Sequence, residues 1–155
     1  MTAIKKKKAV KTDSFSLEIE AKSANESFAR MAVAAFVARL DPTVSELADI
    51  KTALSEAVTN AIVHGYRNSR GVGRIRIKGA VYEGGKVVLE VKDKGCGMAD
   101  VELCLRPLYT GAPEEERSGM GFTVMESFCD SLRVRSAPGK GTTVVLTKRL
   151  GGGAE

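Results

Sequence analysis

The chain has 155 residues, 43% of them hydrophobic and 28% charged, which is enough for one globular domain without disulfide or metal support. Its three cysteines, Cys96, Cys104 and Cys129, show no C-x-x-C spacing, and with His64 as the single histidine we expect no zinc site. The longest apolar run, residues 31–38, is far below the ~20 residues that cross a bilayer. No apolar segment follows the N-terminal lysines, so we expect no signal peptide and a cytoplasmic protein with free thiols.

The net charge of +5 is concentrated at the N-terminus. Residues 1–12 hold five lysines and no acid, and the rest of the chain holds 19 basic and 19 acidic residues. A short like-charged run is usually solvated and disordered. We therefore expect a basic disordered tail over residues 1–13 and no direct contact with nucleic acid.

The first expected element is a strand over residues 14–20, where Phe15, Leu17 and Ile19 alternate with polar residues. A helix over residues 25–40 follows, because its apolar residues recur every three or four positions. Asp41-Pro42 ends this helix, since the residue before a proline avoids the helical conformation.

Thr43 and Glu46 form a capping-box pattern at the start of a second helix, which Gly65 ends. Two strands follow, one around Ile75 and Ile77 and one over residues 87–91, joined by a turn at Gly84-Gly85.

A polar stretch rich in glycine runs from about residue 93 to residue 121 and has little periodicity, which is typical of a functional lid. A short helix over residues 120–129 and a hairpin with strands 131–137 and 142–149 complete the chain. The order of elements predicts an α+β fold, with helices covering one face of a largely antiparallel sheet.

Four motifs carry the chemistry, and the first lies on the second helix. Glu56, Asn60 and His64 are four residues apart, so they drift by only ~40° per step and share a face. The apolar residues of that helix lie on the opposite side: Leu47, Ile50, Leu54 and Ala61.

The second motif, Asp93-Lys94-Gly95-Cys96-Gly97, stands at the end of a predicted strand. An aspartate there can accept a hydrogen bond from an exocyclic amine such as that of adenine, and the glycines let the backbone approach a ligand. The third motif, residues 118–122, opens a helix whose N–H groups suit an anion. The fourth, residues 138–142, has the pattern of an ordinary hairpin turn.

In this order and at these separations the motifs resemble the nucleotide-binding boxes of the family that groups DNA gyrase, Hsp90, histidine kinases and MutL: E-x-x-x-N, D-x-G-x-G, G-x-G and G-x-G-T. The resemblance implies a Bergerat-type two-layer sandwich of helices on a mixed, mostly antiparallel sheet, with ATP between the helices and a mobile lid. The chain has no Walker A pattern.

Further stretches resemble the family of sporulation anti-sigma-F factors: NESFAR (25–30), DPT (41–43), SEAVTNAIVHGY (55–66), PLYT (107–110) and ERSGMGF (116–122). The resemblance covers a kinase and anti-sigma domain over residues 14–150 and leaves a flexible end over residues 151–155. It implies a homodimer that inhibits a sporulation sigma factor. It also implies a serine/threonine kinase that uses ATP and Mg²⁺ to phosphorylate a serine on a small anti-anti-sigma protein.

The same resemblance assigns the nucleotide contacts. Asn60 coordinates Mg²⁺ through its amide oxygen, Asp93 recognises adenine, and Thr142 backs the adenine pocket. Gly95 and Gly97 admit the base and ribose side of the nucleotide.

The resemblance also assigns the reacting end of the site and a partner contact. Glu56 acts as the base toward the serine hydroxyl, and Arg117 meets the γ-phosphate. Arg30 contacts both protein partners. The residues beside the phosphates are Ser118, Gly119, Met120 and Gly121.

Several alternatives share these motifs. A histidine kinase needs a phospho-accepting histidine on separate helices, and His64 lies in the nucleotide helix, where packing or hydrogen bonding explains it better. A gyrase- or MutL-type ATPase would carry a transducer domain, for which 155 residues leave no room. A stress-response paralogue of the anti-sigma family and an ATP-dependent anti-sigma binding module without kinase activity stay open.

Overall fold

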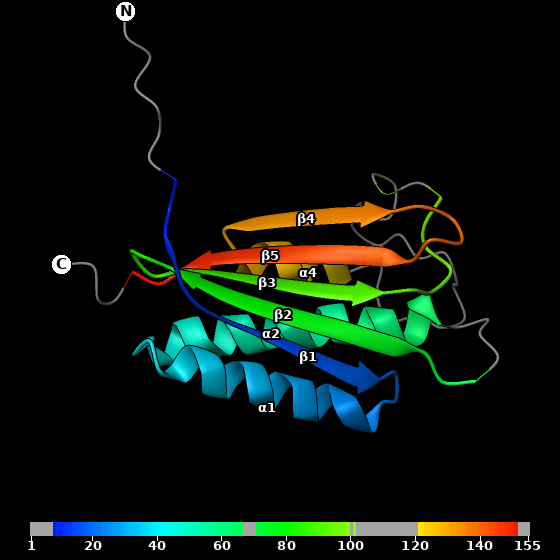
Figure 1. Ribbon diagram of the computed structural model, residues 1–155, viewed down its shortest axis with the longest axis horizontal. Helices are drawn as coiled ribbons and strands as arrows, with labels where there is room; N and C mark the ends of the chain where they lie inside the picture. The colour runs from blue at the N-terminus through cyan, green and yellow to red at the C-terminus, as the bar shows by residue number, and fades with distance from the viewer. Residues whose placement is uncertain (1–7, 67–70, 100, 102–120, 152–155) are drawn as a thin grey trace, which may run out of the picture.

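The computed structural model describes residues 8–66, 71–99, 101 and 121–151. Within them the chain forms a five-stranded sheet with helices on one face (Figure 1). The elements in chain order are β1 (Lys11–Glu20), α1 (Ala24–Ala38), α2 (Val44–Asn60), the π-helical turn η1 (Ala61–Gly65), β2 (Arg74–Tyr82), β3 (Lys86–Asp93), α4 (Gly121–Phe128), β4 (Ser131–Ser136) and β5 (Thr142–Arg149).

The strand order is β1-β2-β3-β5-β4, and each of these four pairings is antiparallel. The predicted α+β sandwich is therefore confirmed. The sheet that the structure describes holds no parallel pair, so the word "mixed" in the prediction does not apply to these five strands.

The first strand begins at Lys11, three residues earlier than expected. Lys11 pairs with Tyr82 and Asp13 with Val81, and the register shifts between Lys11 and Asp13. The carboxylate of Asp13 also pairs with Arg39, just after α1. The end of the predicted tail is therefore the start of the edge strand.

The second helix begins at the predicted capping box. The Glu46 amide donates to the Thr43 hydroxyl at 3.0 Å, and the Thr43 amide donates to the Glu46 carboxylate at 2.9 Å. These bonds satisfy two N–H groups that have no partner within the helix. The other end of the helix widens into η1, which stops at Gly65 as expected.

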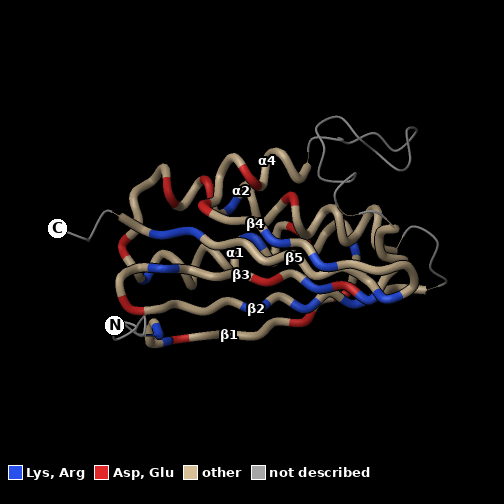
Figure 2. The backbone as a smooth tube through the Cα atoms, turned by 90° about the horizontal axis from the view of Figure 1, so that it is seen from above, with Lys and Arg blue, Asp and Glu red and all other residues tan. Residues whose placement is uncertain are grey.

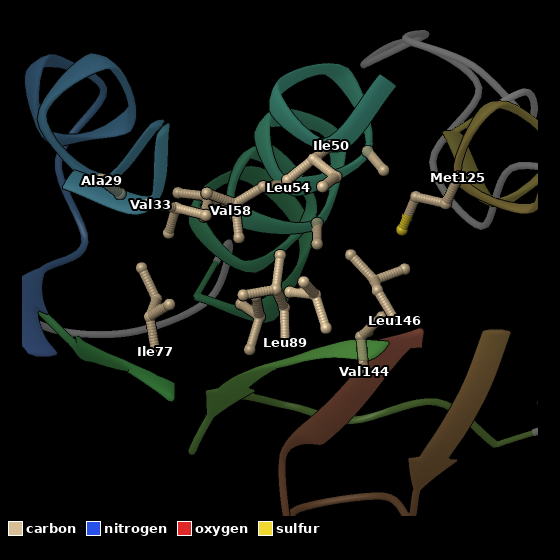
Figure 3. Close-up of a cluster of buried hydrophobic side chains, with 14 of the residues drawn as sticks. Ala29, Val33, Ile50, Leu54, Val58, Ile77, Leu89, Met125, Val144 and Leu146 are labelled. Carbon is tan, nitrogen blue, oxygen red and sulfur yellow. The ribbon is translucent and has the colours of Figure 1, made fainter. Parts of the chain in front are cut away.

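The core lies between the helices and the inner face of the sheet (Figure 3). Val33 of α1, Leu54 and Val58 of α2 and Met125 of α4 are fully buried above the strands. The sheet contributes alternate residues, as the two-residue period of a strand requires; those labelled in Figure 3 are Ile77, Leu89, Val144 and Leu146. This packing fixes the ends of α2 and β3 next to each other.

Across the described ranges, the structure contains no helix that is both long and apolar enough to cross a membrane.

Candidate functional site

The site begins with two polar side chains on α2. Glu56 and Asn60 are half-buried, which agrees with the predicted shared face and with a cover above it. That cover is Gly121, the first residue of α4. A Cβ atom on Gly121 would lie 3.2 Å from Asn60 Nδ2, 3.3 Å from Asn60 Oδ1 and 3.5 Å from Glu56 Oε2. The first and third motifs therefore meet, and a side chain at position 121 would crowd the Asn60 amide.

The second motif places a carboxylate inside the protein. Asp93 ends β3 and is 4% exposed, and it is the buried charged residue of the described core. Burial raises the pKa of the Asp93 carboxyl, while backbone N–H groups of Gly95 and Thr142 oppose the rise. The Gly95 bond measures 2.8 Å. A buried carboxylate with spare acceptor capacity is suited to a ligand amine.

Gly65 brings α2 and Asp93 together. A Cβ atom there would lie 2.9 Å from Asp93 Cγ and 3.0 Å from Oδ1, so the Gly65 Cα packs directly on the carboxylate. The Gly65 carbonyl accepts a hydrogen bond from the Cys96 amide at 2.7 Å. A Cβ on Gly95 would lie only 1.8 Å from the same carbonyl oxygen. This close approach joins the end of the second helix to the D-x-G-x-G loop.

The fourth motif is also part of this assembly. A Cβ on Gly97 would lie 2.0 Å from the Ala137 carbonyl oxygen, and the Gly139 amide donates to the Cys96 carbonyl at 2.7 Å. Asp93 and Thr142 are direct partners in the β3–β5 pairing. The hairpin turn that had no function in isolation therefore forms one wall around Asp93.

Ser136 links the same two loops, and the sequence analysis missed it. Its hydroxyl oxygen accepts from the Met98 amide at 2.8 Å, lies 2.8 Å from Thr142 Oγ1 and donates to the Gly141 carbonyl at 3.0 Å. A hydroxyl has one donor and two acceptor positions, so this set can use all three. Ser136 pairs with Thr142 across the predicted hairpin, and that register was the signal that could have identified it.

Tyr66 is a second residue that the sequence analysis missed. Its hydroxyl donates to the Arg74 carbonyl and accepts from the Lys94 amide at 2.8 Å. The tyrosine follows η1 and so ties the start of β2 to the second motif.

Arg30 lies on α1, outside the four motifs. Its Nε is 3.4 Å from a Glu26 carboxylate oxygen, one turn away on the same helix. The same oxygen accepts a hydrogen bond from the hydroxyl of Ser55, the neighbour of Glu56 on α2. The proposed partner contact is thus connected with the proposed nucleotide helix by one carboxylate.

Some predicted residues fall outside the described ranges. They are Arg117, Ser118, Gly119 and Met120. Their roles stay predictions.

The described residues fit a nucleotide with a metal carried on its phosphates. They contain no group of three or more histidine, cysteine, aspartate or glutamate side chains that could hold a metal ion. Mg²⁺ at nucleotide sites commonly takes one or two protein oxygens and completes its shell with phosphates and water. The half-buried Asn60 amide below Gly121 matches that limited donor set.

Comparisons with known proteins identify the family of the domain. Residues 19–148 match the model of the histidine kinase-like ATPase domain. An anti-sigma F factor of Thermoanaerobacter sp. (strain X514) is 56% identical over 140 residues, which cover 90% of this chain and 96% of that protein. An anti-sigma F factor of Clostridium kluyveri is 53% identical over 136 residues, covering 88% and 94%.

Two solved structures share the fold. The crystal structure of the RsbU and RsbW domains of Rv1364c from Mycobacterium tuberculosis has a TM-score of 0.65 at 24% identity, over 90% of this chain and 33% of that one. The histidine kinase domain of a blue-light activated histidine kinase from Erythrobacter litoralis has a TM-score of 0.53 at 18% identity, over 81% and 61%.

Proposed function

This chain belongs to the anti-sigma F factor family of histidine kinase-like ATPase domains, and from that premise we propose that it inhibits a sigma factor and phosphorylates a serine on an anti-anti-sigma protein. The observation that supports the proposal most is the convergence of all four motifs. Gly121 lies over Glu56 and Asn60, and Gly65 lies on Asp93.

Asp93 accepts a hydrogen bond from the exocyclic amine of adenine in this proposal. Its buried carboxylate is held by the amides of Gly95 and Thr142, so its orientation is fixed before the ligand binds. Gly95 and Gly97 admit the base and ribose side, and Thr142 backs the pocket. Specificity for adenine follows, because guanine presents a carbonyl at the position of that amine.

Asn60 contributes an amide oxygen to Mg²⁺, and bound Mg²⁺ neutralises charge on the phosphates. Glu56 takes the proton of the substrate serine hydroxyl as the oxygen attacks the γ-phosphorus. The bond from that phosphorus to the β-bridging oxygen breaks, and ADP leaves. Phosphoryl transfer depends mostly on positioning and charge, which a carboxylate next to the metal ligand can provide.

Replacement of Glu56 by Gln tests the kinase role. The amide keeps the shape of the side chain and loses the base, so we expect intact ATP affinity and a loss of transfer of about 100-fold or more. The measurement is phosphoserine on a purified anti-anti-sigma protein after incubation with ATP and Mg²⁺. Normal transfer by the variant removes Glu56 from the role. Sigma binding without any phosphoserine in the wild type identifies an ATP-dependent binding module instead.

Sigma binding is assigned to the α1 surface around Arg30. Arg30 is half-buried and pairs with Glu26, which leaves part of the guanidinium accessible to a partner. We expect Arg30→Ala to weaken capture of the sigma factor and to leave ATP affinity unchanged. Equal capture by the variant and the wild type contradicts the assignment.

A homodimer is part of the proposal, and the exposed side of α1 supports it. Ala24, Phe28, Met31, Ala35 and Ala38 are exposed and follow one another at spacings of four and three, the pattern of a coiled-coil seam. Phe28 and Met31 are 55% and 60% exposed. A second copy can pair this stripe with itself around a two-fold axis.

Sedimentation of the Met31→Glu variant tests the dimer. We expect a monomer at concentrations where the wild type is a dimer, because a charge would be buried in the seam. Val44→Glu is the matched control, since Val44 is an 88% exposed apolar residue outside the stripe. A dimeric Met31 variant contradicts the proposed seam.

A further inference from the structure

The outer face of the sheet carries more basic than acidic residues, although residues 13–155 contain equal numbers of both. The helices cover only the inner face, and no described helix lies on the outer one (Figure 1). Along the five strands, the outward positions hold three acidic residues: Glu18, Glu20 and Glu90. They hold nine basic residues: Lys11, Arg74, Arg76, Lys78, Lys86, Lys92, Arg133, Arg135 and Arg149. Figure 2 shows these basic positions following the strands.

The helices have the opposite balance. Together α1, α2 and α4 carry five acidic residues and two basic ones. The domain is therefore polarised, with a negative helical layer and a positive sheet layer. Residues 13–155 have a net charge of zero, but a partner meets one face at a time. Either face can therefore bind a partner of opposite charge.

The basic residues concentrate at one end of the outer face. Arg76 and Lys78 of β2 and Lys92 of β3 lie beside Arg133 and Arg135 of β4, with β5 between. We call these five residues the sheet patch. Where β5 crosses the patch, its outward residues are the short side chains Thr143 and Val145. Three inter-strand spacings of ~4.8 Å make the patch about 14 Å wide.

The charges of the patch are only partly paired across the strands: Glu18 lies opposite Arg76, and Glu90 lies opposite Lys78. Arg76 and Lys92 are direct cross-strand partners, and like charges in that position are destabilising. All five residues of the patch are exposed, and no ion pair within the described residues involves any of them. Glu90 lines a small hollow with Arg76, Lys78 and Lys92 but compensates only part of their charge. Five basic side chains thus face two acidic neighbours, and the patch keeps an excess of positive charge.

The chemistry of the patch favours a phosphate backbone over a protein. Protein interfaces are depleted of lysine at their centre and enriched in aromatic residues. The patch has neither an aromatic nor a large apolar side chain, and the aromatic residue of the outer face, Tyr82, lies at the far end under the Lys86 ammonium. Single-stranded nucleic acid also needs aromatic side chains for stacking. A duplex keeps its bases stacked and presents regularly spaced phosphates.

We propose that the sheet patch is a sequence-independent binding surface for the phosphate backbone of double-stranded DNA. It lies on the face of the sheet opposite the nucleotide motifs, so the domain can hold both ligands at once. The interaction is electrostatic and weakens steeply as salt rises.

Fluorescence anisotropy with a labelled DNA duplex of mixed sequence tests the proposal on the full chain. The patch variant carries Arg76→Gln, Lys92→Gln and Arg135→Gln. We expect its affinity to fall by about tenfold or more and the slope of log K against log salt to fall by about 2.7, since each lost phosphate contact removes ~0.9. The ATP affinity of this variant stays unchanged, which shows that it folds.

Two control variants give the result its meaning. Lys22→Gln, Arg39→Gln and Lys51→Gln remove the same charge away from the patch and should leave duplex affinity within about twofold. Replacement of Lys5, Lys6, Lys7 and Lys8 by Gln measures the contribution of the tail. Equal losses in the patch and control variants overturn the proposal. So do a loss confined to the tail variant, tighter binding of a single strand than of the duplex, and absence of duplex binding at low salt.

Discussion

Lys92 and Asp93 are adjacent in β3, but their side chains leave the sheet on opposite faces. Lys92 is exposed among other cations, whereas Asp93 is buried against Gly65. The two-residue period of a strand produces this separation, and the helices bury the inner face of the sheet from solvent. A carboxylate on the buried face forms directional hydrogen bonds with defined partners. A cation on the solvent-exposed face acts through its long-range field, which salt screens.

The largest expected effect comes from Gly95→Ala on the inner side. The new Cβ would lie 1.8 Å from the Gly65 carbonyl oxygen, a backbone atom that cannot rotate away. We expect a loss of about 3 kcal/mol in the free energy of unfolding and loss of measurable ATP binding. Chemical denaturation and an ATP titration measure both.

The control for Gly95→Ala is Gly139→Ala. Gly139 has a φ of +74° and no atom within 4 Å of a built Cβ, so only backbone strain of about 1 kcal/mol applies. Equal destabilisation by the two substitutions would show that the contact between Gly95 and Gly65 does not matter.

A comparison of Asp93→Asn with Lys92→Gln sharpens the contrast between the faces. We expect Asp93→Asn to reduce ATP affinity by about tenfold or more, because a charged acceptor for the adenine amine is lost. Lys92→Gln should leave it unchanged. An ATP titration in which both neighbours matter equally would contradict the division of the strand.

The same substitution predicts a pH effect. Burial raises the pKa of the Asp93 carboxyl above its unfolded value of 3.8, so the folded protein binds more protons than the unfolded one in the range above that value. Ionisation of Asp93 therefore lowers stability as pH rises through this range. We expect the stability of Asp93→Asn relative to wild type to increase from pH 4 to pH 7 in denaturation curves. If the stabilities of Asp93→Asn and wild type depended on pH in the same way, burial would not raise the pKa of the Asp93 carboxyl as described.

A smaller effect is expected for Ser136→Ala. The Met98 amide and the Gly141 carbonyl lose their partner, at about 1–2 kcal/mol in the free energy of unfolding. ATP affinity should fall by a few-fold, since the two loops around Asp93 are no longer tied together. Ser131→Ala, at the exposed start of β4, should change neither quantity.

The smallest effect is expected for Thr43→Ala. It removes the cap of α2 at the end far from Asn60, so stability should fall by about 1 kcal/mol. ATP affinity should not change. A change in affinity would show that capping transmits along the helix to the site.

The sequence predicted the elements because their signals are local. The capping pattern of Thr43 and Glu46, the alternation in β3 and the glycine turn before it each specify one structure, and the shared face of Glu56 and Asn60 follows from helical spacing. The contacts of Gly65 with Asp93 and of Ser136 with Met98 join residues 28 and 38 positions apart. Only the packing of η1 and the hairpin against β3 creates them, so no local pattern could reveal them.

The charge distribution shows the same limit. Counting residues assigns the excess charge to the N-terminus, and this count is correct for the chain as a whole. The polarity of the folded domain depends on which strand residues face outward and on where the helices pack. The amino-acid composition contains no information about the facing of strand residues or the packing of the helices.

The central claim is that nucleotide binds on the inner side of the sheet, between α2, α4 and the loops around Asp93. Chemical-shift mapping of backbone amides during titration with ATP and Mg²⁺ tests it most directly. We predict the largest shifts at Gly65, Gly95, Gly121 and Thr142 and none at Arg76, Lys78 or Arg133 on the outer face. Shifts confined to the outer face, or an unchanged spectrum at saturating ATP, would contradict the account.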